Sequence, residues 1–246
     1  MGNQKSKHNS NKKPIKDIES NKKSNLLTSL TLTQYNGKSF ERKLENNLES
    51  ITELEISSQD DFEKCIEYCK QIPNLQILHF KYSSLNDDKI DKIITLVNDK
   101  KLSYLNLMNN KITQVGAKKL FDSLARNETI GVLNLMHNQI CHHETLFDFL
   151  KHNHCLRILG ISGNKLSLST KENLLKNLRS NYTLCDITMD SNDLETRYLN
   201  ESIRQALLEN KSSKPLKILI LLIRRDKKSI LSILPRRLVI YMFKFF

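Results

Sequence analysis

An α/β solenoid made of repeated strand–helix units is the fold class that this sequence predicts. An apolar pattern of the form LxxLxLxxNx[LI] recurs four times between residues 102 and 194. The stretches between the copies carry apolar residues at helical spacing. At 246 residues and 39% hydrophobic content, the chain is long and apolar enough to bury one continuous core.

The clearest copy of the pattern is LSYLNLMNNKI, in which Leu102 is the first position and Asn110 the ninth. Three further full copies begin at Ile130, Leu156 and Leu184. Weaker copies without the asparagine begin at Leu27, Ile51 and Leu75. Successive copies start 24 to 28 residues apart, which leaves room for a helix after each strand.

Helices are expected between the strands because apolar residues there fall on one face. The predicted helix faces comprise Ala117, Leu120, Phe121 and Leu124; Leu146, Phe147 and Leu150; Leu174, Leu175 and Leu178; and Ile203, Ala206 and Leu207. In each strand, three apolar side chains are expected to point inward. The asparagine at the ninth position is expected to satisfy backbone groups where the chain bends out of the strand.

The run from Leu102 to Ile140, including Gly116 and Ala117 at a helix start, resembles the ribonuclease-inhibitor type of leucine-rich repeat. The resemblance is strong over about 75 to 200 and weaker before and after. It implies a horseshoe with a concave parallel sheet and convex helices over residues 26–210. It also implies a non-enzymatic binding scaffold.

Residues between the leucines of each strand should face the concave surface. The third-position column contains Glu53, Ile77, Tyr104, Val132, Ile158 and Asp186, and the seventh contains Ser57, Lys81, Met108, Met136, Ser162 and Asp190. An apolar centre therefore lies between acidic ends. We predict that a protein partner binds Ile77, Tyr104, Met108, Val132, Met136, Ile158, Asp186 and Asp190. The alternative is that a terminal segment of the same chain covers this patch.

No metal site or cofactor is predicted. Asp186, Asp190 and Asp193 favour a basic partner over a cation, since nothing completes a ligand set. A second candidate cluster comprises Cys141, His142, His143, His152, His154 and Cys155. Its two halves precede and follow one helix, so they should lie on opposite edges of the solenoid, too far apart for one zinc ion.

Enzymatic motifs are missing from the sequence, and the prediction is that the chain is not an enzyme. It has no GxSxG, phosphate-binding loop, HExxH or paired-carboxylate motif. Its five cysteines lack the spacing of a disulfide framework, which indicates a reducing compartment. The buried-helix pair Cys65 and Cys69 is expected to be free.

The net charge of +12 is concentrated at the two ends of the chain. Residues 1–23 carry seven lysines against two acids, and residues 211–246 carry ten basic residues against one acid. The centre is close to neutral, which argues against a nucleic-acid groove and for an anionic membrane surface as the partner of the N-terminal end.

The first residues, MGNQKSK, match the signal for N-myristoylation at Gly2. Residues 1–25 are predicted to be a disordered basic tail. Within it Lys5, Lys7, Lys12 and Lys13 would lie at the membrane surface. The expected location is cytoplasmic and peripheral on a membrane. The simpler alternative is an unmodified, solvated tail.

Residues 211–246 are predicted to form a capping repeat and an amphipathic helix. Leu216, Leu219 and Leu221 restate the repeat, but Arg224 replaces its asparagine. The apolar run from Leu216 to Ile223 is too short to span a bilayer. The final segment has Leu238, Met242 and Phe246 on one helical face. It would serve as a cap, or as a helix that lies on a membrane.

Three other functions remain open. Leu234, Pro235, Leu238, Met242 and Phe246 resemble the opening of an F-box, which implies a ubiquitin-ligase adaptor. Regulation of a small GTPase, or action as a secreted bacterial effector on host proteins, is allowed by analogy with other proteins that carry this repeat.

Overall fold

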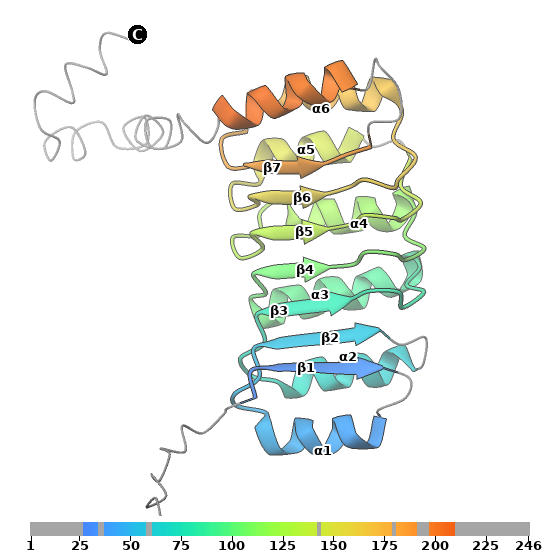
Figure 1. The fold of residues 1–246 in the computed structure, drawn as a ribbon, viewed down its shortest axis with the longest axis vertical. Coiled ribbons are helices and arrows are strands. Elements are labelled where there is room, and N and C mark those ends of the chain that lie inside the picture. The colour runs from blue at the N-terminus through green and yellow to red at the C-terminus, as the bar shows by residue number, and fades with distance from the viewer. Residues whose placement is uncertain are drawn as a thin grey trace, which may run out of the picture.

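The computed structural model describes residues 27–33, 37–57, 61–141, 144–178, 181–190 and 197–209. Within them, seven parallel strands form one sheet in sequence order (Figure 1). The strands are β1 (Ser29–Thr33), β2 (Glu53–Ser57), β3 (Ile77–Phe80), β4 (Tyr104–Asn106), β5 (Val132–Asn134), β6 (Ile158–Gly160) and β7 (Asp186–Thr188). Each of the seven begins two residues after a predicted repeat start, including the three weak copies.

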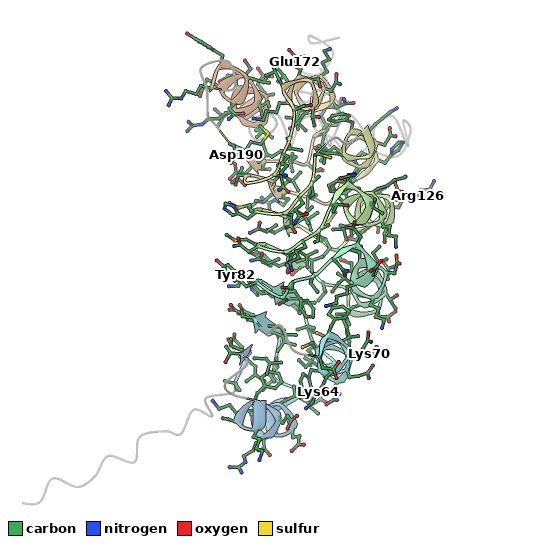
Figure 2. The ribbon with its side chains drawn as sticks, turned by 90° about the vertical axis from the view of Figure 1, so that its right-hand side faces the viewer. Lys64, Lys70, Tyr82, Arg126, Glu172 and Asp190 are labelled. Carbon is green, nitrogen blue, oxygen red and sulfur yellow. The ribbon has the colours of Figure 1, made fainter. Side chains whose placement is uncertain are left out.

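A helix follows each strand, which confirms the predicted strand–helix unit. The helices are α1 (Gly37–Asn47), α2 (Phe62–Gln71), α3 (Ile90–Lys100), α4 (Gln114–Leu124), α5 (Glu144–His152) and α6 (Leu168–Leu178), with a further helix over 197–209 and a short 3-10 turn, η1 (Asp87–Lys89), before α3. The helices follow the outer side of a shallow arc and the sheet lines its inner side (Figure 2). The predicted α/β solenoid is therefore confirmed.

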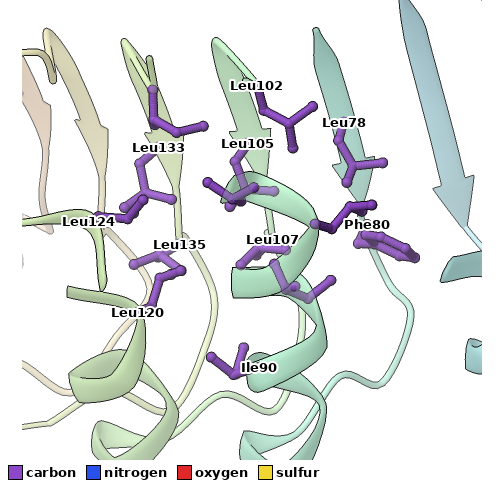
Figure 3. Close-up of a cluster of buried hydrophobic side chains, with 14 of the residues drawn as sticks. Leu78, Phe80, Ile90, Leu102, Leu105, Leu107, Leu120, Leu124, Leu133 and Leu135 are labelled. Carbon is purple, nitrogen blue, oxygen red and sulfur yellow. The ribbon is translucent and has the colours of Figure 1, made fainter. Parts of the chain in front are cut away.

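The core lies between the sheet and the helices and runs the length of the solenoid. The fourth position of each repeat is occupied by a leucine or isoleucine that points into it, and Leu54, Leu78, Leu105, Leu133 and Leu159 are fully buried. Helix residues such as Ile90, Leu120 and Leu124 meet these strands from the outer side (Figure 3). Because the apolar residues of each repeat pack only on those of the adjacent repeats, the core is continuous along the solenoid.

The buried face of α5 differs from the predicted one. Leu146 and Leu150 are buried as expected, but the aromatic side chain in the core is Phe149, while Phe147 packs only partly against it. The rings of Phe149 and Phe121 are stacked with centroids 5.2 Å apart. Phe147 and Phe149 lie on opposite flanks of the stripe formed by Leu146 and Leu150, about 80° to either side, so the orientation of the helix decides which one is buried.

The ninth-position asparagines bind backbone groups as the sequence predicts. The Asn110 amide donates to the carbonyl oxygens of Phe80 (2.7 Å) and Leu107 (2.9 Å), and its side-chain oxygen accepts from the amide of Leu85 (3.0 Å). Asn138 and Asn164 repeat this arrangement. Each asparagine thus joins its own repeat to the preceding one. Asn192, its fourth counterpart, lies outside the described residues.

A serine replaces the asparagine in the weak third copy. Ser83 is buried, and its hydroxyl donates to the carbonyl oxygen of Ile56 at 3.1 Å. The hydroxyl also lies 3.1 Å from the carbonyl oxygen of Lys81. A shorter side chain therefore makes part of the same connection.

A second series of asparagines, which was not predicted from the sequence, binds backbone groups at the opposite edge of the sheet. Asn127, Asn153 and Asn181 each lie three residues before a repeat start. The side-chain oxygen of Asn153 accepts from the amides of Cys155 (3.0 Å) and Leu156 (2.7 Å), and its amide donates to the carbonyl oxygen of Leu124 (2.7 Å). The motif Nxx[LI] before β5, β6 and β7 was the available signal.

The N-terminal end of the core is closed by α1. Phe40 and Leu44 are almost fully buried, and the ring of Phe40 lies 4.9 Å from that of Tyr68 on α2. Glu41 accepts a hydrogen bond from the Tyr68 hydroxyl at 2.6 Å and pairs with Lys64 at 2.6 Å. The first helix is therefore fixed to the second by both apolar and polar contacts.

Within the described ranges, no helix has both the length and the apolar character needed to cross a bilayer. The predicted N-terminal tail 1–25, with Gly2, Lys5, Lys7, Lys12 and Lys13, lies outside those ranges, as does the C-terminal region 211–246.

Candidate functional site

The predicted third-position column forms one continuous row across the sheet. Strand pairing places Glu53 beside Ile77, Ile77 beside Tyr104, Tyr104 beside Val132, Val132 beside Ile158 and Ile158 beside Asp186. Neighbouring strands of a sheet lie about 4.8 Å apart, so these residues are immediate neighbours along the row. The structure thus brings together residues that span more than half of the sequence.

The apolar centre of this row is less open than an exposed patch. Ile77, Tyr104 and Val132 are half-buried, and so are Met108 and Met136 of the seventh-position column. Ile158, at 39% exposed, is the most accessible member. The reason is mutual shielding, because side chains in register on adjacent strands cover one another.

Met136 illustrates that shielding. The next strand carries Gly160 in the fifth-position column, and a Cβ atom there would lie 3.1 Å from the Met136 Cγ and 2.9 Å from the Asn134 Oδ1. Glycine at 160 therefore leaves the space into which Met136 leans. The flexible thioether of methionine suits such an irregular gap and can adapt to a partner.

His79, which the sequence analysis did not single out, connects the N-terminal part of the face. Its Nε2 lies 3.2 Å from the Glu53 carboxylate, its Nδ1 lies 3.3 Å from the Asn106 side-chain amide, and its ring centroid lies 5.0 Å from that of Tyr104. Burial lowers the pKa of His79, and the nearby Lys81 ammonium lowers it further, against the opposing effect of Glu53 and Glu55. The imidazole is therefore neutral at pH 7.

The acidic ends predicted for the face are mostly engaged within the protein. Glu55 pairs with Lys81 at 2.7 Å, and Glu53 bonds to His79. The Asp190 carboxylate accepts from the amide of Gly163, with its two oxygens at 2.9 and 2.8 Å. The Asp190 side chain is partly buried and ends the backbone ladder of the preceding repeat, and its contact with a partner stays a prediction.

Asp186 remains the accessible acid of the face. It is exposed, and none of the described side chains forms a hydrogen bond or an ion pair with its carboxylate. It lies beside Ile158, the most accessible apolar residue of the row. The apolar row therefore ends in one negatively charged side chain.

A further column lies at the eighth position, where the chain turns out of each strand in the left-handed conformation. Its members are Tyr82 (φ 55°), Asn109 (φ 55°), His137 (φ 53°) and Gly163 (φ 72°). This conformation is uncommon for a bulky residue. Tyr82 is nevertheless 58% exposed and projects on the same side of the molecule as Asp190 (Figure 2). An accessible aromatic side chain thus stands at the edge of the concave face.

The cysteine and histidine cluster is split as the strand–helix order requires. Cys141 follows β5 and its thiol lies 3.2 Å from the Gln114 side-chain oxygen. His152 ends α5, His154 and Cys155 follow it, and the three line a cavity with Arg126 on the other edge. His142 and His143 lie outside the described residues. Where the structure is described, no three metal-binding side chains are placed so that they could hold a metal ion.

Cys65 and Cys69 form no disulfide and are buried in α2. Burial raises the pKa of the Cys69 thiol, so it stays protonated and unreactive. The two thiols pack as small apolar side chains.

No protein-family model matches the chain, and no curated protein matches it in sequence. Among solved structures, it is similar to a tropomodulin C-terminal domain from Caenorhabditis elegans, at 18% identity over 65% of this chain and 98% of the other, with a TM-score of 0.52. Two more distant similarities are to leiomodin-1 actin-binding site 2 (16% identity, 72% of this chain and 91% of the other, TM-score 0.40) and to internalin C2 from Listeria monocytogenes (20% identity, 61% and 58%, TM-score 0.39). The chain has a leucine-rich-repeat fold.

Proposed function

We propose that this protein is a non-enzymatic scaffold that binds a protein partner through its concave face. The observation that carries the proposal is the continuous row from Ile77 to Ile158, in register on four adjacent strands and bordered by Met108 and Met136. An apolar surface of this kind favours protein association, and its methionines can adapt to the shape of a ligand. The ribonuclease-inhibitor-like type of repeat is part of the proposal, since each unit of 24 to 28 residues contains a helix.

The chemistry of the face describes the partner. Its centre would bind aliphatic or aromatic side chains, with Tyr104 and the exposed Tyr82 as aromatic contacts. A lysine or arginine of the partner would lie near Asp186. A nucleic acid is disfavoured, because the central part of the chain is close to neutral.

The test replaces two central residues at once. Tyr104→Ala with Met136→Ala should abolish retention of the protein that crosslinks to wild-type chain in cells. Val115→Ala is the matched control, because Val115 is 53% exposed on α4, away from the sheet. Retention of the same protein by the double variant would contradict the proposed site, and so would its loss from the Val115 variant.

We further propose that the scaffold is held at a cytoplasmic membrane face. Myristoylation of Gly2 would supply one apolar anchor, and Lys5, Lys7, Lys12 and Lys13 would bind anionic headgroups. Either signal alone binds a membrane only weakly, with about 1 kcal/mol from each lysine near an anionic leaflet.

The acylation test uses intact mass of protein made in a eukaryotic host. Wild-type chain should lack Met1 and carry a myristoyl group, and Gly2→Ala should carry none. Membrane fractions should contain the wild-type protein and lose the Gly2→Ala protein. An unmodified wild-type mass would rule out the anchor.

A further inference from the structure

Among the described residues the sheet ends at β7, and two core positions of this last repeat are less buried than those of the repeat before it. The fourth and sixth positions of the preceding repeat, Leu159 and Ile161, are at most 2% exposed. Their counterparts Ile187 and Met189 are only partly buried. The difference has a simple origin, since no described strand lies on the far side of β7.

A cavity of about 700 Å³ lies at this end of the sheet. Ile187 and Met189 line it from the strand, and Ile203 and Leu207 line it from the helix over 197–209. In the earlier repeats, the space between strand and helix is closed by the apolar residues of the following repeat. Polar and charged residues also line it, including Arg197, Glu201 and Arg204. The cavity therefore has the place of a missing repeat and four apolar core positions in its lining.

The chain itself contains the matching segment. Leu216, Leu219 and Leu221 restate the first, fourth and sixth positions of the repeat. The helices α1 to α6 end two to six residues before the next repeat starts, and the helix over 197–209 ends seven residues before Leu216. The connection to Leu216 is therefore one residue longer than the longest that the described repeats use, and it is long enough to return the chain to the sheet.

We propose that residues 216–222 add to β7 as an eighth parallel strand and close this cavity. The register follows from the earlier pairs, in which equal repeat positions lie side by side. Leu219 then lies against Ile187, and Leu221 lies against Met189. Ile218, Ile220 and Leu222 take the third, fifth and seventh positions of the concave face.

The backbone pattern of the earlier repeats gives two specific hydrogen bonds. The amide of Ile161 donates to the carbonyl oxygen of Thr188, and that of Asp186 donates to the carbonyl oxygen of Arg157. By the same pattern, the amide of Met189 donates to the carbonyl oxygen of Ile220, and the amide of Ile218 donates to that of Cys185. The Met189 amide thus reports directly on the eighth strand.

The eighth strand would also change the binding face, because Asp186 would then lie between two apolar residues of the third-position column. Ile158 stands on one side of it and Ile218 on the other. The basic group of a partner would be held between apolar contacts, which is a more selective arrangement than an acidic end.

Strand alternation supplies a matched test in the full-length protein. Leu219→Asp with Leu221→Asp places charges in the core, whereas Ile218→Asp with Ile220→Asp places them on the concave face. We expect hydrogen exchange of the Met189 amide to rise at least about tenfold in the first pair and to stay within about twofold of wild type in the second. Equal effects of the two pairs, or no effect of the first, would overturn the proposal.

Crosslinking tests the register independently. In a chain with Cys141, Cys155 and Cys185 replaced by serine, Thr188→Cys with Ile220→Cys should react with a short bismaleimide within one molecule. Thr31→Cys with Ile220→Cys is the control, since Thr31 holds the same repeat position on β1 at the other end of the sheet. A crosslink to Thr31, or crosslinked dimers in place of an internal crosslink, would show that the segment lies elsewhere.

Discussion

The side-chain amide of Asn138 donates to the carbonyl oxygen of Leu107, 31 residues earlier, at 2.9 Å. The oxygen of the same side chain accepts from the amide of Ile112 at 3.1 Å. One buried side chain therefore satisfies backbone groups of two repeats at the point where both leave the sheet.

Replacement of Asn138 with alanine should destabilise the protein by about 1–3 kcal/mol, because it leaves the buried amide of Ile112 without its acceptor and removes the hydrogen bonds to the carbonyl oxygens of Leu107 and Leu135. Chemical denaturation followed by circular dichroism measures the change. Gln139→Ala is the control, since that neighbouring side chain is exposed and should change stability by less than about 0.5 kcal/mol. Equal losses from the two variants would refute this role.

Phe149→Ala should cost about 3–5 kcal/mol, the range for loss of a large aromatic side chain from a core. Phe147→Ala should cost clearly less, because Phe147 only borders the core. The ratio of the two losses in thermal or chemical unfolding checks the orientation of α5. The reverse order would mean that the helix is rotated toward the face expected from sequence.

Gly163→Ala should be destabilising by at least about 1 kcal/mol, since Gly163 has φ 72° and alanine disfavours that conformation. The new methyl group would also collide with the His137 ring. In the double variant with His137→Ala, only the steric part of the loss should disappear. A thermodynamic cycle in urea separates the two parts, and a complete rescue would exclude the backbone contribution.

The stability of the protein should depend on pH through His79. Its pKa in the folded state is below the usual 6.5, so the folded state binds fewer protons than the unfolded state. The stabilisation is full above pH 6.5 and is lost as the pH falls through the lowered pKa. Unfolding free energies at pH 7.5, 6.5 and 5.5 should show this fall, and His79→Asn should reduce it. An unchanged pH profile in the variant would assign the effect to other groups.

Sequence periodicity was sufficient to place all seven strands and the inward-facing residues. It works because each strand has the same neighbours, so the same positions are buried in every copy. The choice between Phe147 and Phe149 was not available from sequence, since both lie near the buried arc of the helix. The roles of His79 and Ser83 were also missed, because each contacts a residue of another repeat and neither belongs to the consensus pattern.

The positions that form the concave face were predicted from the sequence, but which of their charged side chains are accessible was not. Sequence positions placed Glu53 and Asp190 at the acidic ends of the face, yet each carboxylate binds a group of the adjacent strand or loop. Pairing of this kind depends on rotamers and turn geometry, which the alternation of residues does not determine. Asp186 is the acid whose accessibility matched its position.

The two asparagine series join a repeat only to its immediate neighbours. The stability of the solenoid is therefore a sum of terms for single repeats and for the interfaces between adjacent repeats. Separation can begin at either end of the described solenoid and proceed one unit at a time, because each described strand pairs only with the strands of adjacent repeats. A ligand laid across the inner surface would touch several units at once and oppose that separation. Occupancy of the face would then appear as slower proteolysis of the terminal units, even though the ligand does not contact the cleavage sites.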